Sequence, residues 1–184
     1  ASLTKARGQL AAAKVKSSIE LVDGILEREA KVILFSCFNR PEQALPKHFG
    51  EACVVLNGET PSAKRQALVD RLQTEPGVRV FVANLVAGGV GLNQTAASQV
   101  VFNDLEWVPA NHWQGEDRAY RIGQTGTVNV HYFVHLNLNA IKGESGRLLH
   151  LGKPVGGRCF GKSLFHLCIF CAVFPFIYGA ACVS

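Results

Sequence analysis

Short apolar runs alternate with amphipathic stretches along the first 135 residues. Five runs are continuous and apolar, which is typical of strands buried on both faces: 31–38, 52–58, 78–84, 99–104 and 127–134. Between them, helical spacing of apolar residues or helix-start signals predict four helices, at 9–29, 41–50, 60–75 and 109–120. Strands separated by helices predict an α/β fold, with a mainly parallel sheet between two layers of helices.

Two of these helices carry local signals at their ends. Thr60 followed by Pro61 predicts a capped helix start, because proline suits the first helical position. Pro46 weakens the short helix at 41–50, which we expect to end near Gly50. Cys37 and Cys53 lie in the apolar runs and are expected to be buried thiols of a reducing compartment.

In a parallel sheet of this kind, ligands bind in the loops that follow the strands. One such loop, "VANLVAGGVGLN" at 82–93, is rich in glycines that let the backbone approach an anion. Another, "LNGETP" at 56–61, places a strand end beside a helix start, where free amides can hold a phosphate. Each loop is a weak signal alone, since structural turns look similar.

The charge of the chain is unevenly distributed. The whole sequence has a formal net charge of +5, but residues 1–136 hold 14 Lys and Arg against 13 Asp and Glu. Residues 137–184 hold five against one. The body therefore gives no compositional argument for DNA binding, and such an argument depends on motifs.

The stretch "QGEDRAYRIGQ" at 114–124 places Arg118 and Arg121 one helical turn apart before a glycine turn. A guanidinium is always charged and binds phosphate or carboxylate through two parallel hydrogen bonds. One interpretation is a pair of surface arginines that bridge to Glu116 and Asp117. The alternative is a pair that is held for an anionic ligand.

The order of several motifs favours the second interpretation. "LNGETPSAKRQALVDRLQ", "ANLVAGGVGLNQTAASQVVFNDLEWVPA" and "HWQGEDRAYRIGQTGTVNVHYFV" follow one another without a gap. Over roughly residues 15–135 the chain resembles the second RecA-like lobe of the Swi/Snf-type helicase-like ATPases of helicase superfamily two. The acidic "GED" before Arg118 is most similar to the fork-remodelling, annealing-helicase branch.

The resemblance implies a site for ATP between this lobe and a first lobe. "QGEDRAYRIGQ" is similar to motif VI of the family, so Arg121 would be the arginine finger, Arg118 its partner, and Gln114 a residue that holds them. "VAGGVGLN" is similar to motif V, and it implies ATP contacts at Gly89, Gly91 and Asn93. A planar cation at the γ-phosphoryl group would stabilise the charge that spreads there in the transition state.

The resemblance also implies contacts to a DNA backbone, at Gly58, Glu59, Thr60 and Asn84. Contacts of this kind follow a strand without reading its bases. Three positions depart from the family's pattern: Asn84 replaces Ser or Thr, Val86 replaces Lys or Arg, and Val108 replaces Asn before Pro109. These departures weaken the implied DNA contacts more than the implied ATP contacts.

No first lobe is present in the sequence. In the family that lobe carries the phosphate-binding loop and the carboxylates for Mg²⁺, so the implied cofactor is ATP with Mg²⁺ and this chain supplies no metal ligand. The chain contains no methionine, even at position 1, and we expect it to be a piece of a longer protein. Alone, it is not expected to hydrolyse ATP.

The last part of the chain has a different character. We divide the sequence into a leading segment at 1–14, the lobe at 15–135, a basic Gly-rich linker at 136–163 and an apolar tail at 164–184. "GGRCFGKS" at 156–163 satisfies a P-loop pattern but lacks a preceding buried strand, so a nucleotide site there is not favoured. The tail has no Asp, Glu, Lys or Arg over 21 residues, which is long enough to cross a bilayer.

The sequence therefore predicts the C-terminal lobe of an ATP-dependent double-stranded DNA translocase or remodeller. Its expected partners are double-stranded or forked DNA and the missing N-terminal ATPase lobe, in a nucleus or a bacterial cytoplasm with its nucleoid. Two alternatives stay open. One is a non-catalytic module that binds DNA or a partner after losing its first lobe, and the other is a protein anchored to a membrane by its tail.

Overall fold

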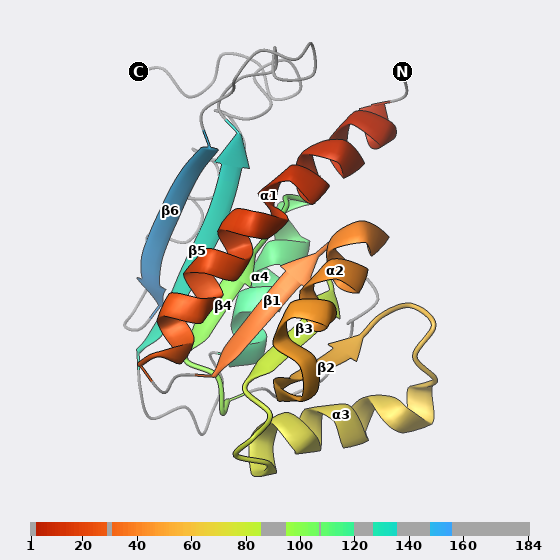
Figure 1. The fold of residues 1–184 in the computed structure, drawn as a ribbon, viewed down its shortest axis with the longest axis vertical. Coiled ribbons are helices and arrows are strands. Elements are labelled where there is room, and N and C mark those ends of the chain that lie inside the picture. The colour runs from red at the N-terminus through yellow and green to blue at the C-terminus, as the bar shows by residue number, and fades with distance from the viewer. Residues whose placement is uncertain are drawn as a thin grey trace.

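The computed structural model describes residues 3–28, 31–85, 95–106, 108–119, 127–135 and 148–155. Helices and strands alternate along most of this chain, as Figure 1 shows. The helices are α1 (Leu3–Leu26), α2 (Asn39–Phe49), the 3₁₀ turn η1 (Gly50–Ala52), α3 (Ser62–Thr74) and α4 (Pro109–Ala119). The strands are β1 (Val32–Ser36), β2 (Cys53–Leu56), β3 (Val80–Asn84), β4 (Gln99–Phe102), β5 (Val128–His135) and β6 (Leu148–Val155).

The described strands form one sheet in the order β2-β3-β1-β4-β5-β6. The first five are mutually parallel, so their carboxyl ends meet at one edge. In this register Phe35 lies beside Phe102, and Phe102 lies beside Tyr132. β6 pairs antiparallel with β5.

Each face of the sheet has its own hydrophobic cluster, because successive strand residues point to opposite sides. One cluster joins Val32, Leu34, Val80 and Val82 of the strands to residues of α1 and α2, including Val22, Ile25 and Leu45. The other joins Ile33, Phe35, Phe81 and Phe102 to α3 and α4, including Val69, Leu72 and Ala119. In Figure 1, α1 and α2 cross the near face of the sheet while α4 lies behind it.

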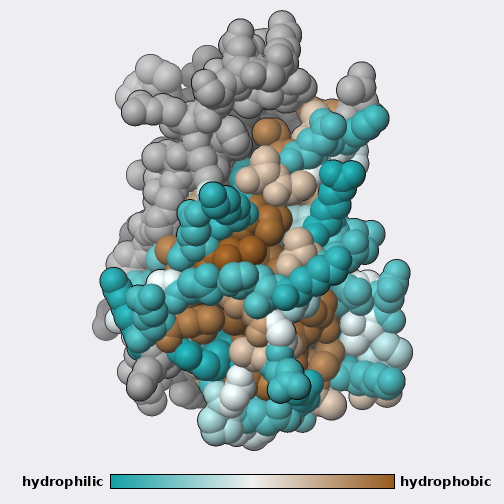
Figure 2. Space-filling view, in the orientation of Figure 1, coloured by the Kyte–Doolittle hydropathy of each residue, from teal (hydrophilic) through white to brown (hydrophobic). Residues whose placement is uncertain are grey.

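The predicted α/β fold is confirmed, with its five parallel strands and four helices. The near face is hydrophilic along the helices, with hydrophobic side chains visible between them (Figure 2). Several hydrophobic residues of the covering helices are partly buried and pack against the cluster below, among them Val15, Ile19 and Phe49. This half-buried pattern is what an amphipathic helix produces when it covers a sheet.

The sixth strand was not predicted. β6 lies inside the stretch that the sequence suggested was a linker, and it contains Gly152 and Pro154, which disfavour a strand interior. Pro154 stands opposite Asn129 on a strand that pairs only with β5 among the described strands. Proline is tolerated at such an edge because one side of the strand makes no ladder hydrogen bonds.

Two helix starts also differ from prediction. α1 begins at Leu3 rather than near residue 9, and so runs across the boundary placed between 14 and 15. Thr60 does not cap α3: the position before the helix is Pro61, and the Thr60 hydroxyl bonds to Asn57 instead. α2 ends at Gly50 as predicted, with a φ of 55° that favours glycine.

No helix in the described ranges is long and apolar enough to cross a membrane. The tail at 164–184 and the P-loop pattern at 156–163 lie outside those ranges. Cys37 and Cys53 are free thiols and are half-buried rather than buried. Desolvation raises the pKa of both, and that of Cys53 reaches about 12, so both thiols are protonated at neutral pH.

Candidate nucleotide and DNA site

A row of three aromatic rings crosses the sheet on the face that α4 covers. Phe35 of β1 stacks on Phe102 of β4 with ring centroids 5.3 Å apart, and Phe102 stacks on Tyr132 of β5 at 4.7 Å. All three side chains are fully buried. The parallel register sets them side by side, and together they form a flat apolar floor at the carboxyl half of these strands.

α4 rests on this floor. At Gly115 the helix approaches so closely that an added Cβ would lie 3.1 Å from Leu85 Cδ1 and 3.2 Å from the Phe102 ring. His112 is fully buried, with its ring 4.8 Å from that of Phe102, and its Nε2 accepts a hydrogen bond from the Glu106 amide at 2.9 Å. The helix is thus held both by packing and by a bond to the loop that precedes it.

A buried polar contact holds the same face of α4 one turn farther along the helix. The Tyr132 hydroxyl donates to Oε1 of Glu116, and both side chains are completely buried. Desolvation raises the pKa of Tyr132 well above its usual value, and the nearby Glu116 carboxylate adds to this effect. Glu116, which one interpretation of the sequence paired with the arginines, is thus bonded to β5.

Arg118, the first of the two predicted arginines, lies at the end of this helix. Its side chain is only 3% exposed, and its guanidinium carbon lies 5.2 Å from the centroid of the Phe35 ring. A cation over an aromatic face is held electrostatically, more strongly when water is excluded. Gln114 lies one turn earlier on α4 and is exposed. Arg121, Gly89, Gly91 and Asn93 lie outside the described residues.

Three of the four residues predicted to contact DNA come together at the end of the sheet formed by β2 and β3, whereas Thr60 does not line the hollow there. Gly58 and Glu59, in the turn after β2, and Asn84, the last residue of β3, line one hollow of about 300 Å³. The rest of its wall is Asn39, Glu42, Gln43 and Asn57. The rule that ligand loops gather at the carboxyl edge thus places together residues that are 25 positions apart in the sequence.

Hydrogen bonds hold the wall of this hollow in place. The Asn84 side-chain amide donates to Glu42 Oε1 at 2.6 Å, which ties β3 to α2. The Thr60 hydroxyl accepts from the Asn57 amide at 3.1 Å and donates to Asn57 Oδ1 at 3.0 Å. Arg65 of α3 donates through Nε to the Thr60 carbonyl at 3.1 Å, so the turn is fixed from the helix side as well.

The electrostatics of the hollow are mixed. Burial raises the pKa of Glu42, the hydrogen bond from Asn84 opposes this shift, and the charges of Asp104 and Glu59 reinforce it. Two carboxylates on the wall repel a phosphate. The backbone amides of Asn57, Glu59 and Thr60 already donate within the turn, so a phosphate group would fit only against the main chain at Gly58.

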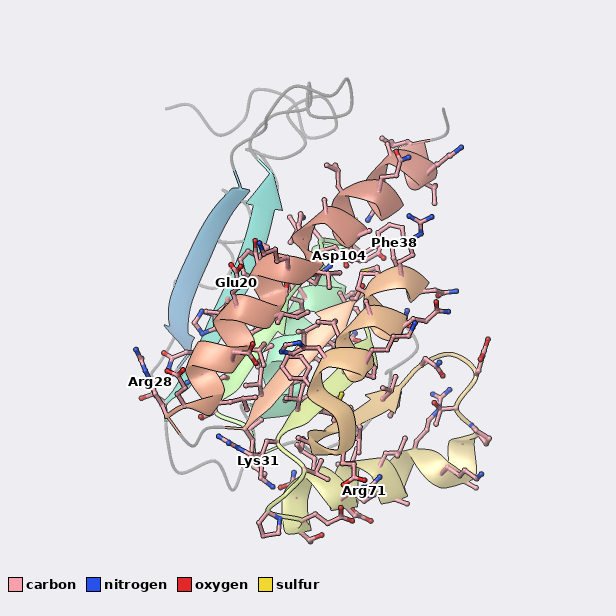
Figure 3. The ribbon with its side chains drawn as sticks, viewed as in Figure 1. Glu20, Arg28, Lys31, Phe38, Arg71 and Asp104 are labelled. Carbon is pink, nitrogen blue, oxygen red and sulfur yellow. The ribbon has the colours of Figure 1, made fainter. Side chains whose placement is uncertain are left out.

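A third cluster was not predicted and lies where β1 and β4 end. Asp104 accepts from the Ser36 hydroxyl at 2.6 Å and from the Cys37 amide at 2.8 Å, and the Asn103 amide donates to it at 3.1 Å. In Figure 3, Phe38 and Asp104 lie beside the amino-terminal half of α1, at the opposite end of the sheet from Lys31. Sequence could have suggested it, since "NDLE" directly follows a buried strand.

Within the described ranges, no group of His, Cys, Asp and Glu side chains is arranged to hold a metal ion. The aromatic floor was also missed from the sequence, although β1, β4 and β5 each carry an aromatic residue near their carboxyl ends. Which of these rings are neighbours depends on strand order and register, and a local pattern contains neither.

The comparison with protein families finds a match to the helicase conserved C-terminal domain over residues 13–123. A zebrafish (Danio rerio) SWI/SNF-related matrix-associated actin-dependent regulator of chromatin, subfamily A containing DEAD/H box 1A, is 40% identical over 107 residues. The aligned part is 56% of this chain and 11% of that protein. The mouse (Mus musculus) DNA annealing helicase and endonuclease ZRANB3 is 47% identical over 79 residues, 43% of this chain and 7% of the relative.

Solved structures show the same fold. The C-terminal part of the Fun30 ATPase domain superposes with a TM-score of 0.59 at 30% identity, covering 64% of this chain and 39% of that one. The Sulfolobus solfataricus SWI2/SNF2 ATPase core in complex with dsDNA gives 0.50 at 28% identity, covering 61% and 24%. The chain thus spans about a tenth of the length of the two curated relatives, 11% and 7%.

Proposed function

We infer what this chain does from one premise: it belongs to the helicase conserved C-terminal domain family, as the C-terminal lobe of a Swi/Snf-type helicase. We propose that it forms half of an ATP-dependent double-stranded DNA translocase or remodeller. It would supply an arginine finger to ATP and backbone contacts to DNA, and it would act where DNA is, in a nucleus or a bacterial nucleoid. The observation that carries the proposal is the hollow in which Gly58, Glu59 and Asn84 converge.

On the ATP side, the proposal assigns the finger to Arg121 and a supporting role to Arg118. The buried position of Arg118 over Phe35 supports this division, because a guanidinium fixed in the protein can orient a neighbour but has little freedom to reach outward. Arg121 follows one turn later in the sequence. Gln114 is exposed on α4 and is available to a ligand between two lobes.

The rest of the ATP site would come from elsewhere. Gly89, Gly91 and Asn93 of the glycine-rich loop would face the nucleotide, and a first lobe would supply the phosphate-binding loop and the carboxylates for Mg²⁺. Among the described residues, Arg118 is the cation that this lobe would bring to such a site. The metal would neutralise phosphate charge when bound, and the arginines add to that effect.

On the DNA side, the proposal assigns backbone contacts to the turn at 57–60 and to Asn84. The exposed Gly58 lets a phosphate approach the main chain, and the Thr60–Asn57 bonds keep the turn in one shape. Glu42 and Glu59 limit the region that a phosphate can occupy. Contacts limited to this region would bind DNA with low affinity. Low affinity suits a lobe that releases a DNA strand and binds it again.

Joining this chain to the first lobe of a related Swi/Snf-type ATPase tests the proposal. The 184-residue chain alone should not turn over ATP, and the joined protein should do so with stimulation by double-stranded DNA. Substituting the phosphate-binding lysine of the added lobe is the control, and it should abolish turnover. ATP hydrolysis by the chain alone would overturn the proposal. So would a joined protein that binds ATP but whose turnover is not stimulated by DNA.

A further inference from the structure

The side of α1 that faces the sheet follows a single stripe along the helix. Its residues are spaced three or four apart: Arg7, Ala11, Lys14, Ser18, Val22 and Ile25. All of them except Arg7 are buried, and Arg7 is half-buried. The stripe changes character after Ser18. Its polar half, from Arg7 to Ser18, offers mainly polar groups, whereas Val22 and Ile25 are aliphatic.

The polar half contacts one short loop, residues 103–105 after β4. Arg7 donates to the Leu105 carbonyl at 2.5 Å. The Ala11 carbonyl accepts from the Asn103 amide at 3.0 Å, and the Ser18 hydroxyl donates to Asn103 Oδ1 at 2.8 Å. Three turns of α1 are thereby bonded to the segment that leads into α4.

Lys14 lies at the centre of this half and is only 6% exposed. Its ammonium donates to the Phe133 carbonyl of β5 at 3.0 Å. The charged or titratable groups that face it are Asp104 from the loop after β4, Arg7 from α1 and Cys37 from the loop after β1. Desolvation lowers the pKa of Lys14 to about 8, although the Asp104 carboxylate opposes the shift.

Buried charges are a poor means of stabilising a helix on a sheet. Apolar residues of similar size would do as well or better, as Val22 and Ile25 do farther along the same stripe. Directional hydrogen bonds do something that apolar contacts cannot: they allow one register and exclude the neighbouring ones. The polar half of the stripe is therefore suited to fixing the position of α1 relative to the loop after β4.

We propose that the polar part of this stripe sets the place of the loop at 103–106 and of α4 behind it, and that Lys14 is a positioning residue at its centre. Lys14 bonds the helix to Phe133 of β5, next to the Asp104 carboxylate, while the residues on either side of it bond to the loop itself. The loop reaches α4 through the Glu106–His112 bond, and α4 carries Arg118. An effect of this positioning on the ATP contact of Arg118 rests on the proposed function, whereas the positioning of the loop and of α4 does not. The segment before residue 15 then belongs to the working unit of the lobe.

Hydrogen exchange in the full 184-residue chain tests the positioning directly. Lys14→Met keeps the length of the side chain and removes its charge and donors. Exchange in β5 around Phe133 and in the peptide 101–119 should therefore become faster, on the order of tenfold, while strands β1 and β3 change little. Lys14→Arg should restore much of the protection. Lys16→Met is the matched control, since Lys16 lies on the same helix, is 87% exposed and is 3.9 Å from Glu20.

A pH titration separates positioning from general support. Both tryptophans of the chain, at positions 107 and 113, lie within the peptide 101–119, so their emission reports on it. Between pH 6.5 and 9.5 the wild type should show a transition near pH 8, which is absent from Lys14→Met and kept in Lys16→Met. If Lys14→Met does not fold, Ser18→Ala should give the same local change in exchange at smaller amplitude.

The outcome does not depend on ATP or on a first lobe. Faster exchange spread evenly over all strands, or a pH transition that survives in Lys14→Met, would overturn the positioning role while leaving the proposed function intact. Conversely, a joined protein without DNA-stimulated turnover would refute the proposed function even if Lys14 behaves as expected.

Discussion

α4 packs tightly against the sheet at Gly115, where a side chain has almost no room. The neighbours are the buried side chains of Leu85 and Phe102, which cannot move without disturbing the aromatic floor. The first glycine of "QGEDRAYRIGQ", Gly115, is therefore required by packing as well as being part of a motif. It lets the helix that carries Arg118 lie close to β4.

Gly115→Ala should lower the free energy of unfolding by roughly 1–3 kcal/mol, because the added methyl group overpacks the contact with Phe102. Gly24→Ala is the matched control in α1, where nothing lies within 4 Å of the added Cβ. That change should instead raise stability by about 0.5–1 kcal/mol through helix propensity. Urea unfolding measures both, and a stabilising Gly115→Ala would contradict the packing account.

Tyr132→Phe removes the donor to Glu116 and should cost about 1–3 kcal/mol at pH 7. The pKa of Tyr132 is raised by burial and by Glu116, so the folded protein keeps a proton that the unfolded chain loses above about pH 10. Stability should therefore fall as pH rises past about 10. The variant should show a smaller fall, and an equal fall in both proteins would refute the assignment.

Among the described helices, α2 has a proline, Pro46, in its interior. Proline removes a backbone donor and crowds the carbonyl four residues earlier, which belongs to Glu42. Glu42 in turn receives the hydrogen bond from Asn84 in the hollow. Pro46 thus lowers the stability of α2 one helical turn from Glu42, which bonds to a residue proposed to contact DNA.

Pro46→Ala should raise the free energy of unfolding by about 1–3 kcal/mol, since it restores a helix donor and removes the clash. Pro41→Ala is the control: Pro41 lies in the first turn of α2, where proline is tolerated, so little or no gain is expected. Thermal and urea unfolding give the comparison. A larger gain at Pro41 than at Pro46 would show that the helix interior is not the source of strain.

Much of the architecture was predictable because apolar runs and helical spacing are local properties. The five parallel strands and the meeting of Gly58 with Asn84 follow from such runs and from the rule for parallel sheets. β6 was missed because Gly152 and Pro154 locally indicate the end of a strand. Both residues are tolerated in a strand at the edge of a sheet, and sequence alone does not show which strand is at the edge. The start of α1 was missed because residues 3–8 contain Gly8 and a single buried apolar residue, Ala6, which is too little to form a periodic pattern.

The body of the chain carries almost equal numbers of acidic and basic residues, and the hollow has two carboxylates. Residues 1–136 should therefore bind double-stranded DNA weakly and without base preference, and binding should weaken steeply with salt. Fluorescence anisotropy at several salt concentrations measures the slope. Tight binding that survives high salt, or a clear base preference, would favour the non-catalytic binding module instead.

The central claim is that two arginines of this lobe complete an ATP site whose other half lies on a first lobe. Its most direct test is the ATP turnover of Arg121→Ala in the chain joined to a first lobe, with DNA binding measured in parallel. Turnover should fall on the order of 10³-fold or more while DNA affinity stays nearly unchanged, because the finger stabilises charge that develops only in the transition state.

Arg121→Lys should rescue poorly, since an ammonium lacks the planar fork. Arg71→Ala, on the exposed face of α3 where Arg71 pairs with Glu75 at 3.0 Å, should keep full activity. Near-normal turnover in Arg121→Ala would contradict the account.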